Sequence, residues 1–192
     1  MREKLDKLET VLLYFICYSF VGWSYELVLW IFEEHNVMNR GFLFGPWLPI
    51  YGFGGLLLYK TLYVYSQKPL LVGEKQRNIK PVIICLLVSV IAAGVELVST
   101  YILDLAHVDW SALWEYSDYA INFDNRIALL PALKFGILAC IIMYGAQKEI
   151  DEFVNDKTKH IVHIALIALF AIDLAVHLMI GSNYTDVPLF YL

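Results

Sequence analysis

The stretch of sequence that decides the fold runs from residue 81 to residue 103 and has the sequence PVIICLLVSVIAAGVELVSTYIL. Glu96 is the one charged residue within it. An α-helix needs about 20 predominantly apolar residues to cross the hydrocarbon core of a bilayer. The stretch therefore predicts a transmembrane helix.

Four other apolar segments of similar length lie on either side of this one. They cover residues 11–32, 46–66, 127–146 and 160–181. Together the five segments predict an all-α, polytopic integral membrane protein with about five transmembrane helices, in a single membrane domain over residues 1–192. A Gly, Glu, Asn-Arg, Pro order that occurs in residues 22–46 and again in residues 94–131 indicates a two-helix internal repeat.

The composition excludes several other classes of protein. The chain has 192 residues, of which 59% are hydrophobic and 17% charged, whereas soluble domains are about 45–50% apolar and about 25% charged. The same apolar content excludes intrinsic disorder. A net charge of -5 excludes nucleic acid as a partner. The three cysteines lie in apolar runs without disulfide or zinc spacing, so we expect neither a metal nor a cofactor.

The distribution of basic residues predicts the orientation of the helices. Ten of the fourteen Lys and Arg residues lie in the N-terminal tail, in the loop after the second segment and in the loop after the fourth. Cytoplasmic loops carry an excess of Lys and Arg. We therefore expect the N-terminus to be cytoplasmic and, with five spans, the C-terminus to be outside. We also expect residues 147–159 to continue the fourth helix into the cytoplasm.

Ionisable side chains inside the predicted spans are the candidate functional groups. A charge at the centre of a bilayer costs roughly 2.5–3.5 kcal/mol on insertion scales, so such residues face protein or water. Counted from the span ends, Glu26, Glu96, Lys134 and Asp173 all fall in the outer half of the membrane, and Arg40 and Arg126 lie at its outer boundary. We expect an outward-facing polar pocket whose substrate-binding residues are Glu26, Arg40, Glu96, Arg126, Lys134, Asp173 and His177.

Three interpretations of these charges remain open. Carboxylates and arginines that bind a solute would make the protein a transporter or permease-type subunit. Three acidic and three basic groups could also neutralise one another, in a membrane-embedded accessory or regulatory protein. In an enzyme acting on lipid headgroups or prenyl phosphates, Arg40 and Arg126 would bind phosphate and a glutamate would act as base. The chain has no ATP-binding or catalytic motif, and Asp173 with His177 supplies too few ligands for a metal.

The segment from Asn39 to Gly55 is an unusual way to begin a membrane helix. Pro46, Pro49 and several glycines disfavour a regular first turn, so we expect a broken or re-entrant entry. Irregular backbone is tolerated at membrane depth only where it is buried in protein or lines a cavity. Its N–H groups, together with Arg40, could hold an anion. The alternative is a tight interfacial turn.

Several short motifs in the sequence resemble those of a known bacterial family. They are YSFVGW at 18–23 followed by Glu26, NRGFL at 39–43, GP at 45–46, PIYG at 49–52, WEYS at 114–117 and Arg126-Ile127. The sequence is similar over about residues 14–145 to the putative ABC-transporter type IV (CmpB-like) family, also described as ABC transporter permeases. Asp173 and His177 lie outside this resemblance.

The resemblance implies a permease-like role and a separate ATP-binding cassette subunit as partner. It also implies a location in the bacterial cytoplasmic membrane. The other expected partners are the lipid bilayer, further copies of the chain and an unidentified small solute or lipid headgroup.

Overall fold

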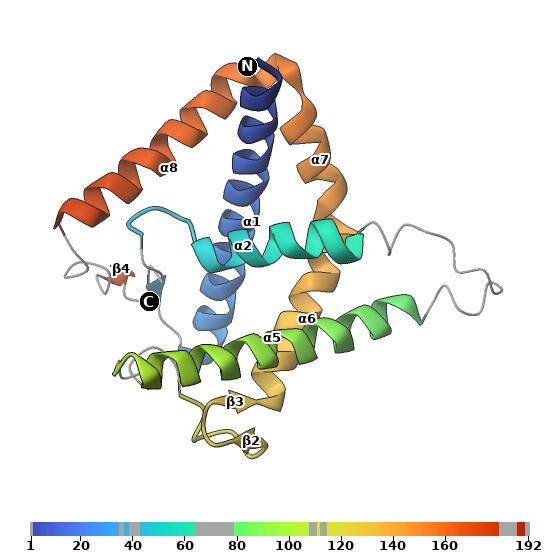
Figure 1. The fold of residues 1–192 in the computed structure, drawn as a ribbon, viewed down its shortest axis with the longest axis vertical. Helices are drawn as coiled ribbons and strands as arrows, with labels where there is room; N and C mark the ends of the chain where they lie inside the picture. The colour runs from blue at the N-terminus through green and yellow to red at the C-terminus, as the bar shows by residue number, and fades with distance from the viewer. Residues whose placement is uncertain are drawn as a thin grey trace. The chain divides into compact units, whose positions relative to one another are not determined.

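The structure is a computed structural model that describes residues 2–34, 37–38, 43–63, 79–107, 111, 115–180 and 188–190. Helices dominate this part of the chain (Figure 1). They are α1 (Arg2–Glu34), α2 (Pro49–Leu58), α5 (Lys80–Leu105), α6 (Leu129–Ile141), α7 (Gln147–Asn155) and α8 (His160–Ile180). The predicted all-α membrane fold is confirmed.

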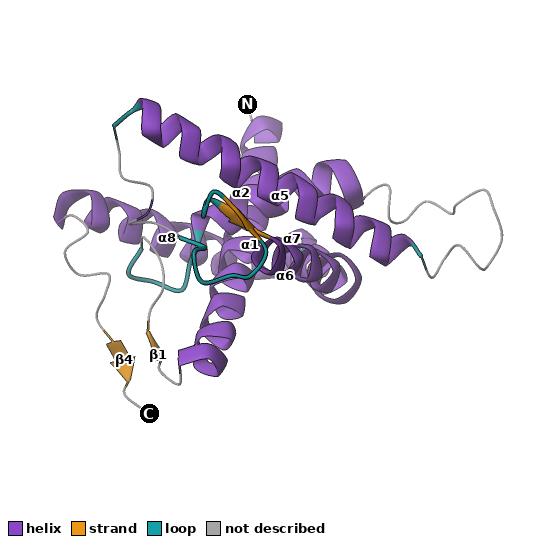
Figure 2. Cartoon of the chain, turned by 90° about the horizontal axis from the view of Figure 1, so that it is seen from below, coloured by secondary structure: helices purple, strands orange, loops and turns teal. Residues whose placement is uncertain are grey.

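Shorter elements join or extend the helices. The π-helical turns η1 (Tyr59–Tyr63) and η3 (Ile142–Ala146) extend α2 and link α6 to α7, and the 3₁₀ turn η4 (Lys157–Lys159) precedes α8. Strands β2 (Asn122–Phe123) and β3 (Ile127–Ala128) form an antiparallel hairpin. Strands β1 (Val37–Met38) and β4 (Pro188–Phe190) pair antiparallel, side by side in Figure 2.

Four stretches of helix in the described residues are long and apolar enough to cross a membrane. They are Lys4–Phe32, Lys80–Leu105, Leu129–Asn155 and Lys157–Met179, and they correspond to the first, third, fourth and fifth predicted spans. Of the second predicted span, the structure describes α2 and η1, and residues 64–66 lie outside the described residues. At 1.5 Å per residue α2 alone covers about 15 Å of the roughly 30 Å hydrocarbon core. That the second predicted span crosses the membrane stays a prediction.

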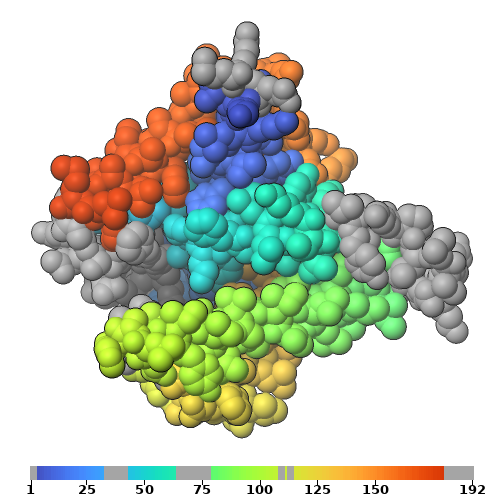
Figure 3. All heavy atoms as spheres, in the orientation of Figure 1, coloured from blue at the N-terminus to red at the C-terminus, as the bar shows by residue number. Residues whose placement is uncertain are grey.

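The chain divides into two compact units. The first contains residues 1–61 and 146–192, with α1, α2, α7 and α8, and the second contains residues 62–145, with α5, α6 and the β2–β3 hairpin. In the first unit α8 begins beside the N-terminal end of α1 (Figure 1). Only 11% of its candidate span is buried, and Figure 3 shows its side chains on an open surface. Such an apolar surface fits contact with lipid.

Glycines bring α2 against α1 in the first unit. A Cβ at Gly22 of α1 would collide with the ring of Tyr51, and a Cβ at Gly55 of α2 would collide with the ring of Tyr18. Because contacts one turn further along α2 fall one turn earlier on α1, the two helices run antiparallel. Small residues allow close helix packing in lipid, where no hydrophobic force drives association. The face of α1 that carries Tyr18 and Gly22 is therefore its packing face against α2.

A buried cluster joins α1, the residues before α2, and α8. Phe15 and Ile16 of α1 pack with Leu43 and Trp47, which precede α2. Half-buried side chains that pack against this cluster are Leu56, Leu166, Ile167, Phe170 and Leu174. Most of these come from α8, so the entry to α2 is enclosed by protein on two sides.

A glycine of the second unit has the same role as those of the first. A Cβ at Gly136 of α6 would collide with the carbonyl oxygen of Cys85 and the hydroxyl of Ser89, both on α5. The hairpin that precedes α6 turns at Asp124 and Asn125, which both have φ 54. Asn and Asp tolerate this left-handed conformation because their short polar side chains can bond locally. Here the Asn122 side chain accepts a hydrogen bond from the Asn125 N–H at 3.2 Å.

Candidate functional site

The residues that lead into α2 form an irregular segment, residues 43–48, here called the entry loop. Leu43 is fully buried, and Trp47 is 8% exposed. The N–H of Leu48 donates to the carbonyl oxygen of Ser19 at 3.0 Å. Ser19 lies near the middle of the α1 candidate span Lys4–Phe32. The broken entry predicted from the prolines and glycines is thus observed, and it reaches the middle of the span.

The carboxylate of Asp173 on α8 holds the entry loop. The N–H of Phe44 donates to Oδ1 at 3.2 Å, and the N–H of Gly45 donates to Oδ2 at 2.8 Å. Unsatisfied backbone amides and unpaired charges are both costly away from water, so each group here reduces the cost of burying the other. The amides predicted to hold an anion therefore bind one that the protein supplies itself. Arg40 lies outside the described residues.

His177 lies one turn after Asp173 on α8 and faces the same loop. The residue is 3% exposed, and its ring centroid is 5.6 Å from that of Phe44. A Cβ at Gly45 would come within 2.9 Å of Asp173 Oδ2. The loop therefore fits closely against α8 at these two residues, which the i, i+4 spacing places on one face of the helix.

Glu26 lies on the packing face of α1 in the first unit. Its Oε1 accepts a hydrogen bond from the hydroxyl of Tyr51 on α2. The ring of the same tyrosine covers Gly22 one turn earlier. Glu26 and Asp173 therefore each bond to the chain around the start of α2, one to the helix and the other to the loop before it.

Glu96 is the acidic candidate of the second unit. The hydroxyl of Tyr116 donates to its Oε1 at 2.7 Å. Its other oxygen, Oε2, is buried and has no hydrogen-bond partner within the described part of the chain. A buried polar atom without a partner costs about 1–3 kcal/mol. The described contacts therefore satisfy only one of the two carboxylate oxygens of Glu96.

Arg126 of the second unit pairs with acidic residues near the ends of α5 and β2. Its Nη1 is 2.6 Å from Asp104 Oδ2, and its Nε is 2.9 Å from Asp124 Oδ2. The guanidinium also lies over the ring of Tyr101, at 4.7 Å from the centroid. Lys134 is half-buried on α6. Arg126 is thus held between two carboxylates, one in the last turn of α5 and the other in the turn after β2.

The six predicted site residues that the structure describes are therefore distributed over both units. Glu26, Asp173 and His177 belong to the first unit, where all three lie near the entry to α2. The second unit contains Glu96, Arg126 and Lys134. A single pocket that includes all seven residues stays a prediction.

A polar network between α1 and α7 was not predicted. The Tyr14 hydroxyl donates to Asp151 Oδ1 at 2.7 Å, and the Tyr18 hydroxyl donates to Gln147 Oε1 at 2.9 Å. Gln147 Nε2 in turn donates to Asp151 Oδ1 at 2.8 Å. The missed signal is the amphipathic pattern of α7, in which Gln147, Ile150 and Val154 are buried. The expected continuation of the fourth helix beyond residue 146 is observed.

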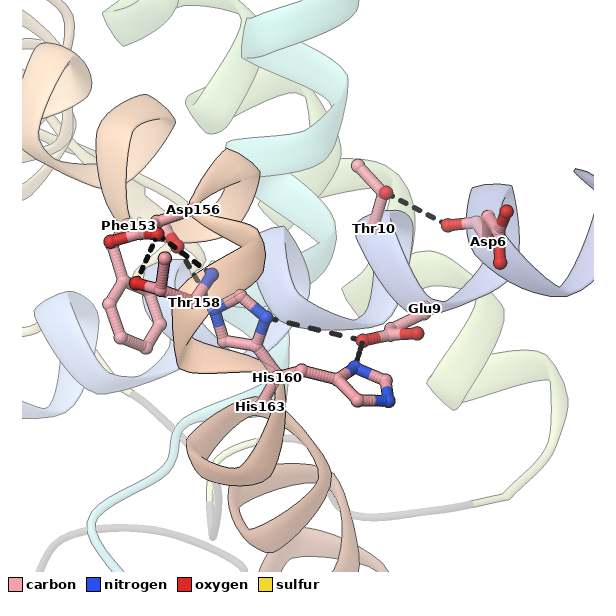
Figure 4. A network of polar contacts seen from close by, with 8 residues as sticks. All are labelled: Asp6, Glu9, Thr10, Phe153, Asp156, Thr158, His160 and His163. Carbon is pink, nitrogen blue, oxygen red and sulfur yellow. Dashed lines mark hydrogen bonds and ion pairs between the residues drawn. The ribbon is translucent and has the colours of Figure 1, made fainter.

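A second polar cluster joins the N-terminal part of α1 and the first turn of α8 to the end of α7 (Figure 4). Glu9 Oε1 lies 3.2 Å from Nδ1 of His160 and 4.0 Å from Nδ1 of His163. The Nε2 of His163 is 2.9 Å from the carbonyl oxygen of Phe153. That oxygen can only accept, so this contact places a hydrogen on Nε2. The cluster fastens the start of α8 to α1.

Asp156 begins the turn η4 between α7 and α8, in the same region (Figure 4). Its Oδ1 accepts from the Thr158 hydroxyl at 2.6 Å and from the Thr158 N–H at 2.9 Å. These two hydrogen bonds, with a smaller contribution from Lys159, lower the pKa of the Asp156 carboxyl below its ordinary value. The charged form of Asp156 therefore stabilises the turn between the two helices.

The second unit contains a cavity of about 230 Å³ that is almost entirely apolar. It is lined by Tyr119, Ala120, Ile121, Leu129, Leu130 and Leu133. None of the seven candidate residues lines it. Within the described residues, no group of three or more His, Cys, Asp or Glu side chains is placed to hold a metal.

Comparison with known proteins identifies one family. The profile of the family described as "Putative ABC-transporter type IV" matches residues 13–178. The match extends beyond the resemblance noted over 14–145, so it includes Asp173 and His177 as well as the other five candidates. Searches of curated proteins and of solved structures found no match.

Proposed function

The chain belongs to the putative ABC-transporter type IV family, and from this premise we propose that it is the membrane-embedded, permease-type subunit of a transport system. Family membership and four helices of spanning length make it a membrane protein of a transport-related family. The site, the orientation and the partner described next are part of the proposal.

The observation that supports the proposal best is the entry loop held by Asp173. Transporters commonly bind their substrates near the middle of the membrane, where a helix is interrupted and its backbone groups face a polar site. Here α2 begins beside the middle of the α1 span, and a carboxylate inside another candidate span contacts the preceding amides. Intramembrane ionisable groups are by default functional.

In the proposed site, the carboxylates bind a cationic solute, an amine or protons that enter from outside. In the first unit the candidate groups are Glu26, Asp173 and His177. In the second unit, taken by itself, the candidate group is Glu96, whose Oε2 has no hydrogen-bond partner among the described residues. Arg40, Arg126 and Lys134 meet the anionic groups of the solute. The proposal places Glu26, Glu96, Lys134 and Asp173 in the outer half of the membrane, and Arg40 and Arg126 at its outer boundary.

The proposed location is the bacterial cytoplasmic membrane, with the N-terminus in the cytoplasm. The C-terminus lies outside if α2 and the residues after η1 cross the membrane. The helical stretch Leu129–Asn155 has 27 residues, about 40 Å at 1.5 Å per residue, which exceeds the roughly 30 Å core. Its last turns, in α7, would then extend into the cytoplasm.

The exposed face of α7 is the proposed docking site for a separate ATP-binding cassette subunit. Lys148 and Glu152 on this face have side chains 81% and 69% exposed, whereas Gln147, Ile150 and Val154 on the other face are buried. The chain itself carries no phosphate-binding loop motif. A membrane subunit that uses ATP would therefore need such a partner.

The test uses the full-length protein in lipid nanodiscs and a screen of small metabolites for ligands that raise its melting temperature, at two pH values. Once a ligand is found, Glu26→Gln and Glu96→Gln are compared with the wild type. Both variants keep an oxygen that accepts from the tyrosine, so we expect them to fold. Because they lack the negative charge of the carboxylate, we expect them to lose the ligand-induced shift. Asp118→Asn, an exposed residue of the loop before β2, is the matched control and should keep it. An unchanged shift in both glutamine variants would contradict the proposal.

One set of contacts favours a second function, that of an accessory protein whose charges are structural. Each described candidate carboxylate has a donor within its own unit: Tyr51 for Glu26, the Phe44 and Gly45 amides for Asp173, and Tyr116 for Glu96. In that case the glutamine variants would unfold at lower temperature and no metabolite would shift the wild type. Turnover of a lipid headgroup by the purified protein would instead favour the enzyme alternative.

A further inference from the structure

Two of the three cysteines lie together between α5 and α6 in the second unit. Gly136, one turn before Cys140 on α6, lies against Cys85 of α5. The Cys140 thiol also donates to the carbonyl oxygen of Pro81 at 3.2 Å. Both cysteines are reduced, as is Cys17, which belongs to the first unit.

The backbones of the two helices approach closely at these cysteines. Packed helices are commonly about 8–10 Å apart, whereas the Cα atoms of a disulfide are about 4.4–6.8 Å apart. Gly136 lies one turn before Cys140 on α6, and a Cβ there would collide with the carbonyl oxygen of Cys85. The same Cβ would lie 2.9 Å from Cys85 Sγ. The missing side chain at residue 136 therefore allows the approach that a disulfide requires.

The surroundings of the pair select the kind of oxidant that can reach it. Cys85 and Cys140 are half-buried and lie inside candidate membrane spans. Only 17% of the α5 span is buried against the rest of the chain. The thiols therefore adjoin a surface open to lipid, where a lipid-soluble oxidant accumulates and a charged or strongly hydrated one does not.

We propose that Cys85 and Cys140 form a redox-reactive pair, which an organic hydroperoxide dissolved in the bilayer converts into a disulfide that joins α5 to α6. The first thiol sulfur attacks the terminal oxygen of the hydroperoxide, so that an S–O bond forms, the O–O bond breaks and the departing alkoxide takes the thiol proton. The second thiol attacks the resulting sulfenic acid, so that the S–S bond forms and water leaves. Two thiols lose two electrons, and the hydroperoxide becomes an alcohol and water.

The test treats the full-length protein in phospholipid nanodiscs with cumene hydroperoxide. Free thiols are counted by a maleimide mass tag, and linked peptides are identified by mass spectrometry. We expect the wild type to lose two of its three thiols and to yield a pair of peptides linked by a Cys85–Cys140 disulfide. Dithiothreitol should reduce this disulfide. A Cys17→Ser variant should lose the same two thiols. Cys85→Ser and Cys140→Ser should form no intramolecular disulfide.

A variant that keeps all three thiols tests the geometry itself. Gly136→Ala separates the two backbones, and we expect it to slow disulfide formation at least tenfold. Gly94→Ala on α5, where a Cβ would meet no atom within 4 Å, is the matched control and should react at the wild-type rate. A disulfide that includes Cys17, a link between two molecules, or equal rates for both glycine variants would overturn the proposal. If hydrogen peroxide reacts as fast as cumene hydroperoxide, the oxidant does not need to reach the thiols through the lipid. That result would also contradict the proposal.

Discussion

The two units bury a carboxylate in a candidate membrane span in different ways. Asp173 in the first unit uses both of its oxygens to accept hydrogen bonds from the entry loop. In the second unit Glu96 uses one oxygen for Tyr116, and the other has no hydrogen-bond partner among the described residues. Asp173 therefore stabilises a particular backbone conformation, whereas the described contacts of Glu96 satisfy only one of its two oxygens.

The largest effect is expected from removal of the Asp173 carboxylate. Asp173→Ala leaves the N–H groups of Phe44 and Gly45 without their acceptors, and a buried donor without a partner costs about 1–3 kcal/mol. We expect the free energy of unfolding in detergent to fall by about 3 kcal/mol. Asp173→Asn retains one acceptor oxygen and should lose about half as much. An Ala variant as stable as the wild type would show that the loop does not depend on this residue.

A smaller effect is expected from adding one methyl group between α1 and α2. Gly55→Ala places a Cβ against the ring of Tyr18, and overpacking of this kind costs about 1–3 kcal/mol. The neighbouring Gly54 meets no atom within 4 Å, so Gly54→Ala should be neutral or should stabilise the helix by up to about 1 kcal/mol. Thermal unfolding of the two variants side by side measures the difference. Equal melting temperatures would contradict the close packing.

Neutralisation of Glu96 should act in the opposite direction to the change at Asp173. Glu96→Gln keeps an oxygen that accepts from Tyr116 and removes a charge that the described contacts satisfy only in part. We expect the free energy of unfolding to stay the same or to rise by about 1 kcal/mol. The measurement is chemical unfolding in detergent beside Asp173→Asn. A loss in both variants would remove the contrast between the two units.

The smallest effect is expected from acid at the turn between α7 and α8. Hydrogen bonds from Thr158 lower the pKa of Asp156, so its charged form stabilises the folded turn at pH values above the pKa of the unfolded chain, about 3.9. This stabilisation is lost as the pH falls through the lower pKa of the folded state. We expect melting temperatures between pH 5 and pH 3 to fall slightly less in Asp156→Asn than in the wild type. An identical decline in both proteins would contradict the role of Asp156.

Residues close together in the sequence account for what could be predicted of the site. The i, i+4 spacing of Asp173 and His177 places both on one face, and Pro46 and Pro49 with the nearby glycines predict an irregular entry. The partners could not be predicted, because they come from distant parts of the chain. The Asp151 carboxylate that Tyr14 contacts lies 137 residues away, and a tyrosine in an apolar run has the same local pattern whether its hydroxyl is bonded or not.

The sequence by itself determined that the protein is an all-α membrane protein, because a bilayer requires about 20 apolar residues in each helix and this requirement is local. It also determined where the regular helix must fail, since proline and glycine act on their own backbone. Only the tertiary structure decided that the amides of Phe44 and Gly45 bind the carboxylate of Asp173, more than 120 residues further along the chain. Helix packing brings these groups together, and no local pattern encodes which helices pack.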